Sequence, residues 1–422
     1  MPVRNAVQPD GLRVRFVVPG NVRHNSGGNV YNAALARELA ALGVAVETCP
    51  LDGDWPVGSA EDRSRLGGLL LADWVDGADG GNGARAGRTV TLVDGLLACG
   101  APEELAAAAA AGRPAWILVH MPLDDTGHDD AGLERRALRA AAGVICTSGS
   151  AAAGIRARHG VSGIRVALPG TETAALAAGS EPPHLLAVAA LLPNKDQTLL
   201  LAALSALTDQ PWTASLVGSD TADPGYAALL RDTVQRLALQ DRIRIPGELR
   251  GGALEAEWAA ADLSLLISQA ETYGLVVTES IARGVPVIVR AGTGAVEALA
   301  AGTPGSRTAP LTAPLTAPSE EPRTEPPEAA GGAAALPGTA VALGADPAPL
   351  AEVLRRWLGD PGVRARWRAA AVDARDRLPG WDATARTVLE ALNPGHPAGQ
   401  PPAVPPETPF AEDSPAAQAG GQ

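Results

Sequence analysis

The hydrophobic pattern of the chain alternates between two periods. Short apolar runs, typical of buried strands, are followed by longer segments in which apolar residues recur at the spacing of a helical turn. A helix is predicted at 29–42, after the first strand. Strands of this first half are predicted at 12–19, 44–50, 89–94, 115–120, 143–147 and 164–168. Because strands that alternate with helices pair in parallel and are covered on both faces, this half predicts an α/β fold.

A second alternating series starts at residue 184. Its strands are predicted at 184–190, 213–217, 243–246, 263–268 and 286–290, and its helices at 195–207, 224–239, 253–261 and 273–283. The segment 170–183 has no periodicity and ends in two prolines, which predicts a linker. Open parallel sheets bind ligands at the carboxyl ends of their strands, so two facing sheets predict a central cleft with a small-molecule site.

The rest of the chain predicts one insertion, a few further elements and a tail. Segment 303–337 contains TAPLTAPLTAP and SEEPRTEPPEAAGG and predicts a disordered surface insertion, with a proline-rich binding motif as the alternative. Residues 393–422 predict a disordered tail. Order is expected in a strand at 339–343 and helices at 348–358, 363–377 and 382–392. The predicted lobes are therefore 1–169 and 184–392.

Composition and charge narrow the class of partner. Hydrophobic residues make up 46% of the chain, enough for a sizeable core. The formal net charge is −13 and aromatic residues are only 3%. Since nucleic-acid binding needs a basic surface and aromatic platforms for the bases, this balance argues against DNA or RNA as the main partner.

Cysteine usage and the lack of long apolar segments predict a cytoplasmic protein. Cys49, Cys99 and Cys146 are far apart and form no CxxC pair, so neither a zinc site nor a disulfide framework is indicated. The first residues do not resemble a signal peptide, and every apolar run is shorter than the ~20 residues that span a bilayer. Peripheral membrane contact stays open.

The most informative segment is ISQAETYGLVVTESIARGVPVIV. Glu271 is expected in the loop after a strand, and Glu279 inside the following helix. The amides of Gly274, Leu275 and Val276 lie near the helix start, where unpaired N–H groups bind phosphate. Two acids flanking a phosphate site fit a sugar nucleotide, whose diphosphate has hydroxyls on both sides. The structural alternative is a surface carboxylate and a helix-terminal acid.

A second signal is the lysine in VAALLPNKDQTLLLAAL. Lysine and arginine together number 34, and Lys195 is the only lysine. A single lysine in an arginine-rich chain suggests a function that needs the compact charge of an ammonium group. The alternative is that the lysine stands by chance on an exposed turn.

Two further segments of the first half carry candidate residues, one in a loop directly before a predicted helix and one at the end of a predicted strand. Gly27 and Gly28 in NSGGNVYN permit close approach of the backbone to a ligand, or belong to a plain loop with Ser26 or Asn25 as helix cap. His120 in WILVHMPL ends a buried strand and is either a functional or a structural histidine.

Together these motifs resemble retaining glycosyltransferases of the two-lobed GT-B fold, most closely glycosyltransferase family 4, over roughly residues 12–300 and 339–392. The resemblance implies two Rossmann-like doubly wound lobes. It implies that Glu271 contacts hydroxyls of the donor sugar and that Glu279 contacts the nucleotide ribose. The amides of Gly274 to Val276 would hold the diphosphate.

The same resemblance implies roles for the remaining candidates. Lys195 would bind the donor diphosphate and stabilise the leaving nucleotide. The backbone of Gly27 and Gly28 would touch the donor phosphate, and His120 would sit beside the donor sugar. The implied reaction is metal-independent and uses a front-face mechanism, with the nucleotide sugar as co-substrate and no cofactor.

Some residues depart from the family pattern or have a simpler explanation. Ala190 stands where the family often has an arginine, with Arg23 and Arg250 as candidate substitutes. The run Asp52-Gly53-Asp54 predicts a turn rather than a metal site. Three structural interpretations complete the set: Gly292, Gly294 and Glu297 in a helix start, Trp381 anchoring a last helix that crosses back to the first lobe, and a solvated acidic loop at Asp124, Asp125, His128, Asp129 and Asp130.

The sequence thus predicts a cytoplasmic, hexosyltransferase-type enzyme that moves a sugar from a nucleotide-diphosphate sugar to an unidentified acceptor. Two rivals stay open, a sugar-nucleotide epimerase of the same fold and a non-catalytic sugar-nucleotide-binding protein. The second rival stays open because Ala190 stands where the family often has an arginine.

Overall fold

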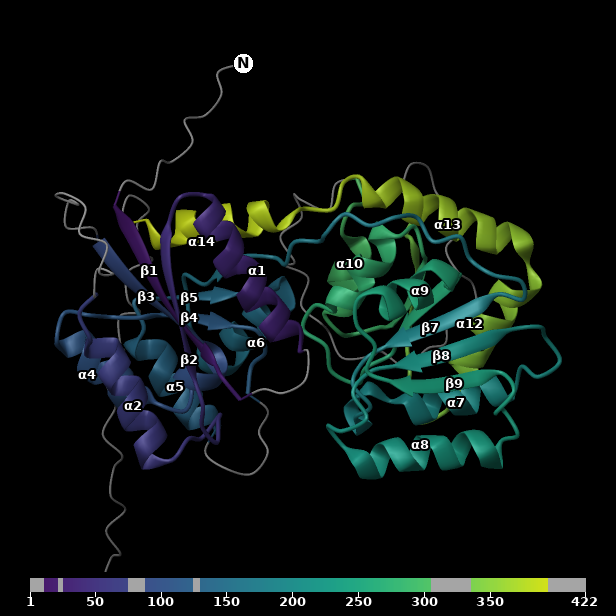
Figure 1. Cartoon of the computed structure of the whole chain (residues 1–422), viewed down its shortest axis with the longest axis horizontal. Helices are drawn as coiled ribbons and strands as arrows, with labels where there is room; N and C mark the ends of the chain where they lie inside the picture. The colour runs from purple at the N-terminus through teal and green to yellow at the C-terminus, as the bar shows by residue number, and fades with distance from the viewer. Residues whose placement is uncertain (1–10, 22–25, 75–87, 124–129, 305–334, 394–422) are drawn as a thin grey trace, which may run out of the picture.

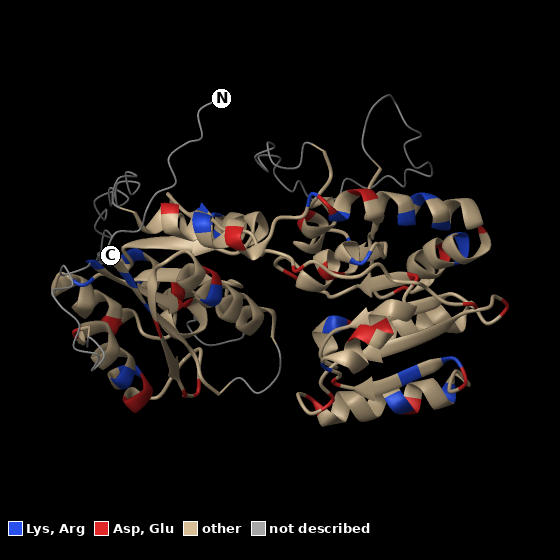
Figure 2. Cartoon of the chain, turned by 45° about the horizontal axis from the view of Figure 1, so that its top comes forward, with Lys and Arg blue, Asp and Glu red and all other residues tan. Residues whose placement is uncertain are grey.

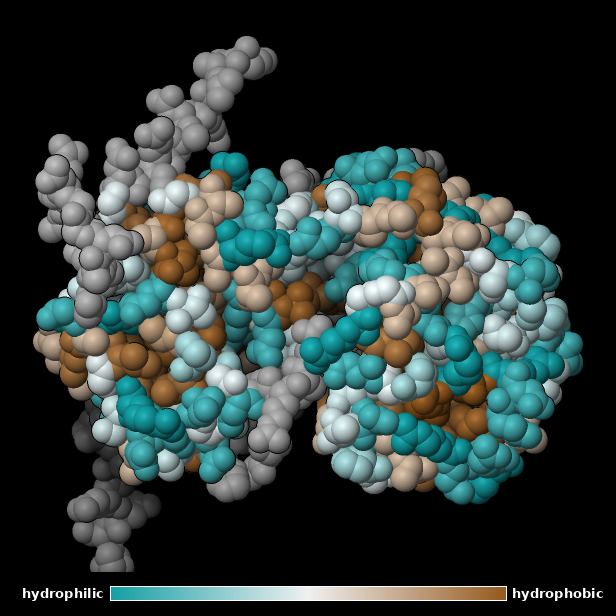
Figure 3. Space-filling model, viewed as in Figure 1, coloured by the Kyte–Doolittle hydropathy of each residue, from teal (hydrophilic) through white to brown (hydrophobic). Residues whose placement is uncertain are grey.

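The computed structural model describes residues 11–21, 26–74, 88–123, 130–304 and 335–393. Two parallel sheets, each between layers of helices, form two lobes side by side (Figure 1). Charged residues of both signs are mixed along the outer helices (Figure 2). The space-filling view shows a groove between the lobes (Figure 3).

In the described residues, six strands form the sheet of the first lobe, in the order β2-β1-β3-β4-β5-β6. These are β1 (Leu12–Pro19), β2 (Ala45–Leu51), β3 (Arg88–Asp94), β4 (Trp116–Val119), β5 (Gly143–Cys146) and β6 (Arg165–Val166). The helices are α1 (Gly27–Ala41), α2 (Ala60–Leu71), α3 (Gly95–Ala98), α4 (Pro102–Ala110), α5 (Asp130–Ala140) and α6 (Gly149–His159). The strand order reverses between β1 and β3, and open parallel sheets generally bind ligands at the carboxyl ends of their strands at such a reversal.

The second lobe also has six strands in its described part, in the order β12-β11-β10-β7-β8-β9. These are β7 (His184–Val188), β8 (Thr213–Val217), β9 (Ile243–Gly247), β10 (Leu263–Leu266), β11 (Val287–Arg290) and β12 (Gly338–Val341). The helices are α7 (Gln197–Ser205), α8 (Pro224–Arg236), α9 (Gly252–Ala260), α10 (Leu275–Ala282), α11 (Ala295–Ala300), α12 (Ala348–Gly359) and α13 (Pro361–Arg375). This is the Rossmann order, and its reversal lies between β7 and β10.

The core of each lobe follows from strands buried on both faces. Successive residues of β1 point to opposite faces, so Phe16 packs in one hydrophobic cluster and Val17 in the other. Leu92 and Val93 on the neighbouring β3 alternate in the same way. Parallel strands of this kind appear in a sequence as continuous apolar runs, which explains why the hydrophobic pattern located them.

The last helix returns to the first lobe. After α13, helix α14 (Trp381–Leu392) lies against α1 (Figure 1). The Trp381 ring meets the ring of Tyr31 edge to face at 5.4 Å, and both rings are buried. A Cβ atom on Gly170 would lie 2.2 Å from the Trp381 nitrogen, so glycine is required where the chain passes the start of α14. The structure thus places Trp381 as the predicted anchor of the crossing.

Two predicted helix starts are wrong for backbone reasons. The predicted helix 195–207 is divided into a 3-10 turn, Pro193–Lys195, and α7, because Asp196 adopts the left-handed conformation with φ 57°. Helix α10 begins at Leu275 rather than residue 273, because Gly274 is left-handed with φ 86°. A left-handed residue interrupts the hydrogen-bond ladder of a right-handed helix.

Several predictions fall on residues that the structure does not describe. The interpretation of the 303–337 insertion and of the 393–422 tail rests mostly on such residues, as does that of the acidic loop that includes Asp124, Asp125, His128 and Asp129. Within the described part of the chain, no helix is long and apolar enough to cross a membrane. Cys49, Cys99 and Cys146 are free thiols.

Replacing Trp381 by Ala tests the anchoring of α14. Because the ring is buried between α1 and the first sheet, we expect the free energy of unfolding to fall by about 3–5 kcal/mol. The measurement is chemical denaturation. The matched control is Leu229→Ala, at a side chain that is 45% exposed, where a change within about 0.5 kcal/mol is expected. Equal effects of the two substitutions would contradict the anchoring role.

Candidate functional site

The strand reversal in the second lobe brings two predicted site residues into contact. Lys195 follows β7 and Glu271 follows β10, the two strands between which the order reverses. The Lys195 Nζ donates to Glu271 Oε2 at 3.0 Å, and both side chains are about one-fifth exposed, 21% and 17%. Their loops are also joined by the backbone, since the Gln269 amide donates to the Asn194 carbonyl at 2.8 Å. A cation and an acid therefore share one accessible point at the ligand-binding edge.

The start of α10 lies directly beside this pair. Gly274 precedes the helix, and no side chain caps the helix start. A Cβ atom on Gly274 would lie 2.6 Å from Leu266 Cδ2 and 3.4 Å from Glu271 Cγ, so only glycine fits here. The amides of Leu275 and Val276 belong to the first turn, where N–H groups lack intrahelical partners and the helix dipole favours an anion. An uncapped helix start therefore lies beside the Glu271 carboxylate that pairs with Lys195.

Glu279 lies farther along α10 and contacts neither Lys195 nor Glu271 in the interactions that join those two residues. Its half-buried carboxylate has no hydrogen bond or ion pair among the described residues. Burial raises the pKa of Glu279, the Arg283 guanidinium opposes this rise and the Glu255 carboxylate adds to it. Arg283 itself pairs with Glu255 at 2.6 Å and stacks over the Trp258 ring at 5.0 Å. Glu279 is therefore a carboxylate with free acceptor capacity on the side of α10 that faces α9.

The glycine pair of the first lobe touches both this helix and His120. A Cβ atom on Gly27 would lie 3.5 Å from Leu275 Cδ1, across the boundary between the lobes. A Cβ atom on Gly28 would lie 3.3 Å from His120 Cδ2. Ser26 caps the helix by accepting from the Asn29 amide at 3.2 Å, whereas the other predicted cap, Asn25, lies outside the described residues. The start of α1 thus links the start of α10 with the histidine.

His120 is held by two polar residues that the sequence analysis did not single out. Its Nε2 lies 2.8 Å from Asn32 Oδ1 and 3.2 Å from Asp94 Oδ2, and Asn32 donates to Asp94 at 2.6 Å. Burial alone would raise the pKa of Asp94, but the His120 ring and the hydrogen bonds from Asn32 and the Leu96 amide hold it below its usual value. A signal existed for Asp94, since it ends the strand beside that of His120.

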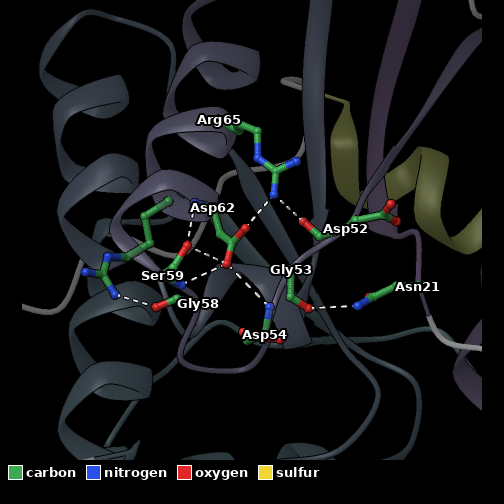
Figure 4. A network of polar contacts seen from close by, with 9 residues as sticks. Asn21, Asp52, Gly53, Asp54, Gly58, Ser59, Asp62 and Arg65 are labelled. Atoms are coloured by element: carbon green, nitrogen blue, oxygen red, sulfur yellow. Dashed lines mark hydrogen bonds and ion pairs between the residues drawn. The ribbon is translucent and has the colours of Figure 1, made fainter.

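The run Asp52-Gly53-Asp54 is part of a polar turn, as predicted (Figure 4). Asp62 Oδ2 accepts from the Ser59 amide and hydroxyl, both at 2.8 Å, which closes a capping box at the start of α2. The Gly53 carbonyl accepts from Asn21 at 3.0 Å, which ties this turn to the loop after β1. The Ser59 amide, then the Ser59 hydroxyl and Arg65, hold the pKa of Asp62 well below its usual value.

Glu297 connects the two lobes. Its carboxylate accepts from the Gly149 amide at 3.0 Å and the Ser150 amide at 3.2 Å, at the start of α6 in the first lobe. Burial raises the pKa of Glu297, and these two hydrogen bonds oppose the rise. A Cβ atom on Gly294 would lie 1.9 Å from the Thr272 carbonyl oxygen, so this glycine has a structural task.

Of the two candidate substitutes for the missing arginine, only Arg250 lies in the described part of the chain, and its ion pair is with Glu248 rather than with a site residue. The Ala190 carbonyl accepts from Gln197 Nε2 at 3.0 Å. Arg250 donates to Glu248 at 2.7 Å on an exposed turn after β9, at the edge of the sheet. Arg23 lies outside the described residues.

Two cavities flank the site. One of about 480 Å³ lies behind the Lys195 turn and is lined by Asp196, Thr198, Leu199, Ala202, Gln269, Arg290, Gly344 and Ala345. The other, of about 210 Å³, is lined by Val18, Pro19, Asn29, Asn32, Ala33, Ala36 and Thr48 and adjoins the Asn32 side chain. Among the described residues no group of three or more His, Cys, Asp or Glu side chains is arranged to hold a metal ion.

Residues 171–311 match the family described as Glycosyl transferases group 1. The mannosylfructose-phosphate synthase of Agrobacterium fabrum is 30% identical over 130 residues, 29% of this chain and 29% of the relative. The D-inositol 3-phosphate glycosyltransferase of Kineococcus radiotolerans is 30% identical over 217 residues, 49% of this chain and 43% of the relative. The chain therefore spans less than half the length of these curated relatives.

Solved structures share the two-lobed architecture. Sucrose-phosphate synthase from Thermosynechococcus elongatus superposes with a TM-score of 0.64 at 19% identity, over 90% of this chain and 98% of that one. Anabaena HepE in complex with UDP and glucose gives a TM-score of 0.62 at 17% identity, over 90% and 99%. The GT-B fold predicted from the motifs is confirmed, and residues 171–311 are similar to the glycosyl transferases group 1 family.

Acid sensitivity tests the polar turn of Figure 4. Because the pKa of Asp62 is lowered in the folded protein, its stabilising effect is complete above the unfolded-state value of about 3.9 and is lost as the pH falls through the folded-state pKa. We expect Asp62→Asn to lower stability at neutral pH and to reduce the loss of stability on acidification. The measurement is urea denaturation at several pH values, with the exposed neighbour substitution Glu61→Gln as control. An unchanged acid profile in Asp62→Asn would contradict this role.

Proposed function

We propose that the protein is a retaining glycosyltransferase that moves a sugar from a nucleoside-diphosphate sugar to an acceptor hydroxyl. The observation that carries the proposal is the contact of Lys195 Nζ with Glu271 Oε2 at 3.0 Å, beside the uncapped start of α10. Both lie at the strand reversal of a glycosyl transferases group 1 domain.

The donor diphosphate would bind where two sources of positive charge converge. The first-turn amides of α10 favour an anion, and the Lys195 ammonium adds a full charge within reach of the same point. Phosphate oxygens would take the place of the Glu271 carboxylate at Nζ. Glu271 would then be free to accept hydrogen bonds from hydroxyls of the sugar. Because these groups supply the positive charge, we propose a metal-independent reaction.

The nucleoside would lie along α10, away from Glu271. Glu279 is half-buried and has free acceptor capacity, as a carboxylate that receives the two ribose hydroxyls requires. HepE, a neighbour in fold, is described in complex with UDP and glucose. We therefore propose UDP-sugars as the first donors to test, in the cytoplasm, where a chain with three free thiols stays reduced.

The acceptor would approach from the first lobe, beside His120. In the proposed front-face step, the bond between the anomeric carbon and the phosphate oxygen breaks and the acceptor oxygen forms a bond on the same face. The leaving phosphate oxygen takes the acceptor proton, and Lys195 neutralises the charge that develops on it. His120, held by Asn32 and Asp94, would orient the sugar rather than act as a base.

One observation favours a second candidate, a non-catalytic sugar-nucleotide-binding protein. Ala190 offers only its carbonyl, to Gln197, at the point where an arginine would add a second cation. A binder would release no free nucleotide with any acceptor, whereas a transferase releases nucleotide only when an acceptor is present. An epimerase would convert the donor itself without an acceptor.

Substitution of Lys195 and Glu271 tests the proposed site. Loss of the cation that stabilises the leaving group should lower kcat about 10²–10³-fold in Lys195→Ala. Glu271→Gln should mainly weaken sugar binding and thus raise KM for the UDP-sugar. The measurement is acceptor-dependent UDP release, and NMR of the product reports whether the anomeric configuration is retained.

The matched control is Arg355→Gln, which breaks an exposed ion pair with Asp209 on another part of the second lobe. It should turn over like the wild type, and EDTA should leave the wild-type rate unchanged. Wild-type turnover in Lys195→Ala, or an inverted product, would contradict the assignment.

A further inference from the structure

The turn that carries Lys195 has an unfavourable backbone. The next residue, Asp196, has φ 57° and ψ 33°, the left-handed conformation. A residue with a Cβ atom is strained there, and it stays there only where the surroundings hold it. What holds Asp196 therefore also determines where the Lys195 side chain begins.

Arg290 holds this turn together with the backbone hydrogen bond from the Gln269 amide to the Asn194 carbonyl. It ends β11 and is almost fully buried, 8% exposed. Its Nη2 pairs with Asp196 Oδ2, its Nε donates to the Ile267 carbonyl at 2.8 Å and its Nη1 donates to the Leu343 carbonyl at 2.6 Å. The planar guanidinium presents these donors in a rigid fork, so a single side chain fixes three segments relative to one another.

Two of these three segments carry the proposed site. Asp196 adjoins Lys195, and Ile267 begins the loop that leads to Glu271. The cavity of about 480 Å³ is lined by Asp196, Gln269 and Arg290, so one side of this junction lacks close packing. On that side, polar links such as the ion pair between Asp196 and Arg290 help to set the position of the turn.

We propose that Asp196 and Arg290 form a positioning pair that sets the contact between Lys195 and Glu271, and through it the affinity for the donor diphosphate. Neither residue touches the donor in this arrangement. The proposal rests on the proposed function for the identity of the ligand, whereas the geometry of the lysine can be tested without any ligand.

The substitutions separate the ion pair from the backbone. Asp196→Gly removes the carboxylate and also relieves the left-handed strain, so a loss of function in it does not come from backbone strain. Asp196→Asn keeps an oxygen that accepts from Arg290, on a residue type that tolerates this conformation. Asp196→Asn should therefore keep much of the lysine positioning and donor affinity that Asp196→Gly loses. Asp209→Asn, in the exposed pair with Arg355, is the control.

The first experiment uses the lysine itself. Because the chain has a single lysine, acylation of its amine can be followed by peptide mass spectrometry without assignment. We expect Asp196→Gly to react several-fold faster than the wild type, as Glu271→Gln also should, and Asp196→Asn and Asp209→Asn to react at the wild-type rate. A wild-type rate in Asp196→Gly would overturn the proposal.

The second experiment asks whether the pair acts through Lys195. Calorimetry with UDP should show a loss of affinity of about tenfold in Asp196→Gly, close to the wild-type affinity in Asp196→Asn, and no further loss when Asp196→Gly is added to Lys195→Ala. Equal losses in both backgrounds would indicate a merely structural role and overturn the proposal. If the wild type binds no nucleoside diphosphate, the proposed function fails, and the acylation rates still decide whether the pair positions Lys195.

Discussion

The proposed donor site depends on the ion pair between Lys195 and Glu271, which a bound diphosphate would replace. Without a donor, Glu271 Oε2 lies 3.0 Å from Lys195 Nζ and neutralises its charge. The ammonium therefore does not face solvent unpaired. Because both side chains are only partly buried, the pair is not locked by desolvation and can exchange one partner for another. In the proposed function, a diphosphate at the start of α10 would supply two negative groups and leave the carboxylate for sugar hydroxyls, so one contact would account for both affinity and orientation.

The specificity of this proposed exchange of Glu271 for phosphate depends on both lobes, because residues of each lobe lie against residues of the other. Gly27 lies against Leu275 of the second lobe, and Gly28 lies against His120. Glu297 caps α6 across the boundary, and α14 returns from the second lobe to pack on α1. On the first-lobe side of this boundary, His120 is held by Asn32 and Asp94.

The hydrophobic pattern predicted every described strand to within two residues at either end, because strands buried on both faces form continuous apolar runs. It placed Lys195, Glu271 and His120 at strand ends, where the topology brings them to one edge. The sequence did not predict a role for Asp196 and Arg290, because their proposed role depends on a left-handed turn and on a partner 94 residues away. Asn32 was missed for a similar reason, since nothing local in the chain indicates that it meets His120, whereas Asp94 could have been found because it ends the strand beside that of His120.

The most direct test of the central claim is a crystal structure with an intact UDP-sugar. The account predicts a phosphate oxygen within hydrogen-bond distance of both Lys195 Nζ and an amide of the first turn of α10, with the Glu271 carboxylate turned from the ammonium to the sugar hydroxyls. A diphosphate bound elsewhere, with the ion pair between Lys195 and Glu271 still intact, would contradict it.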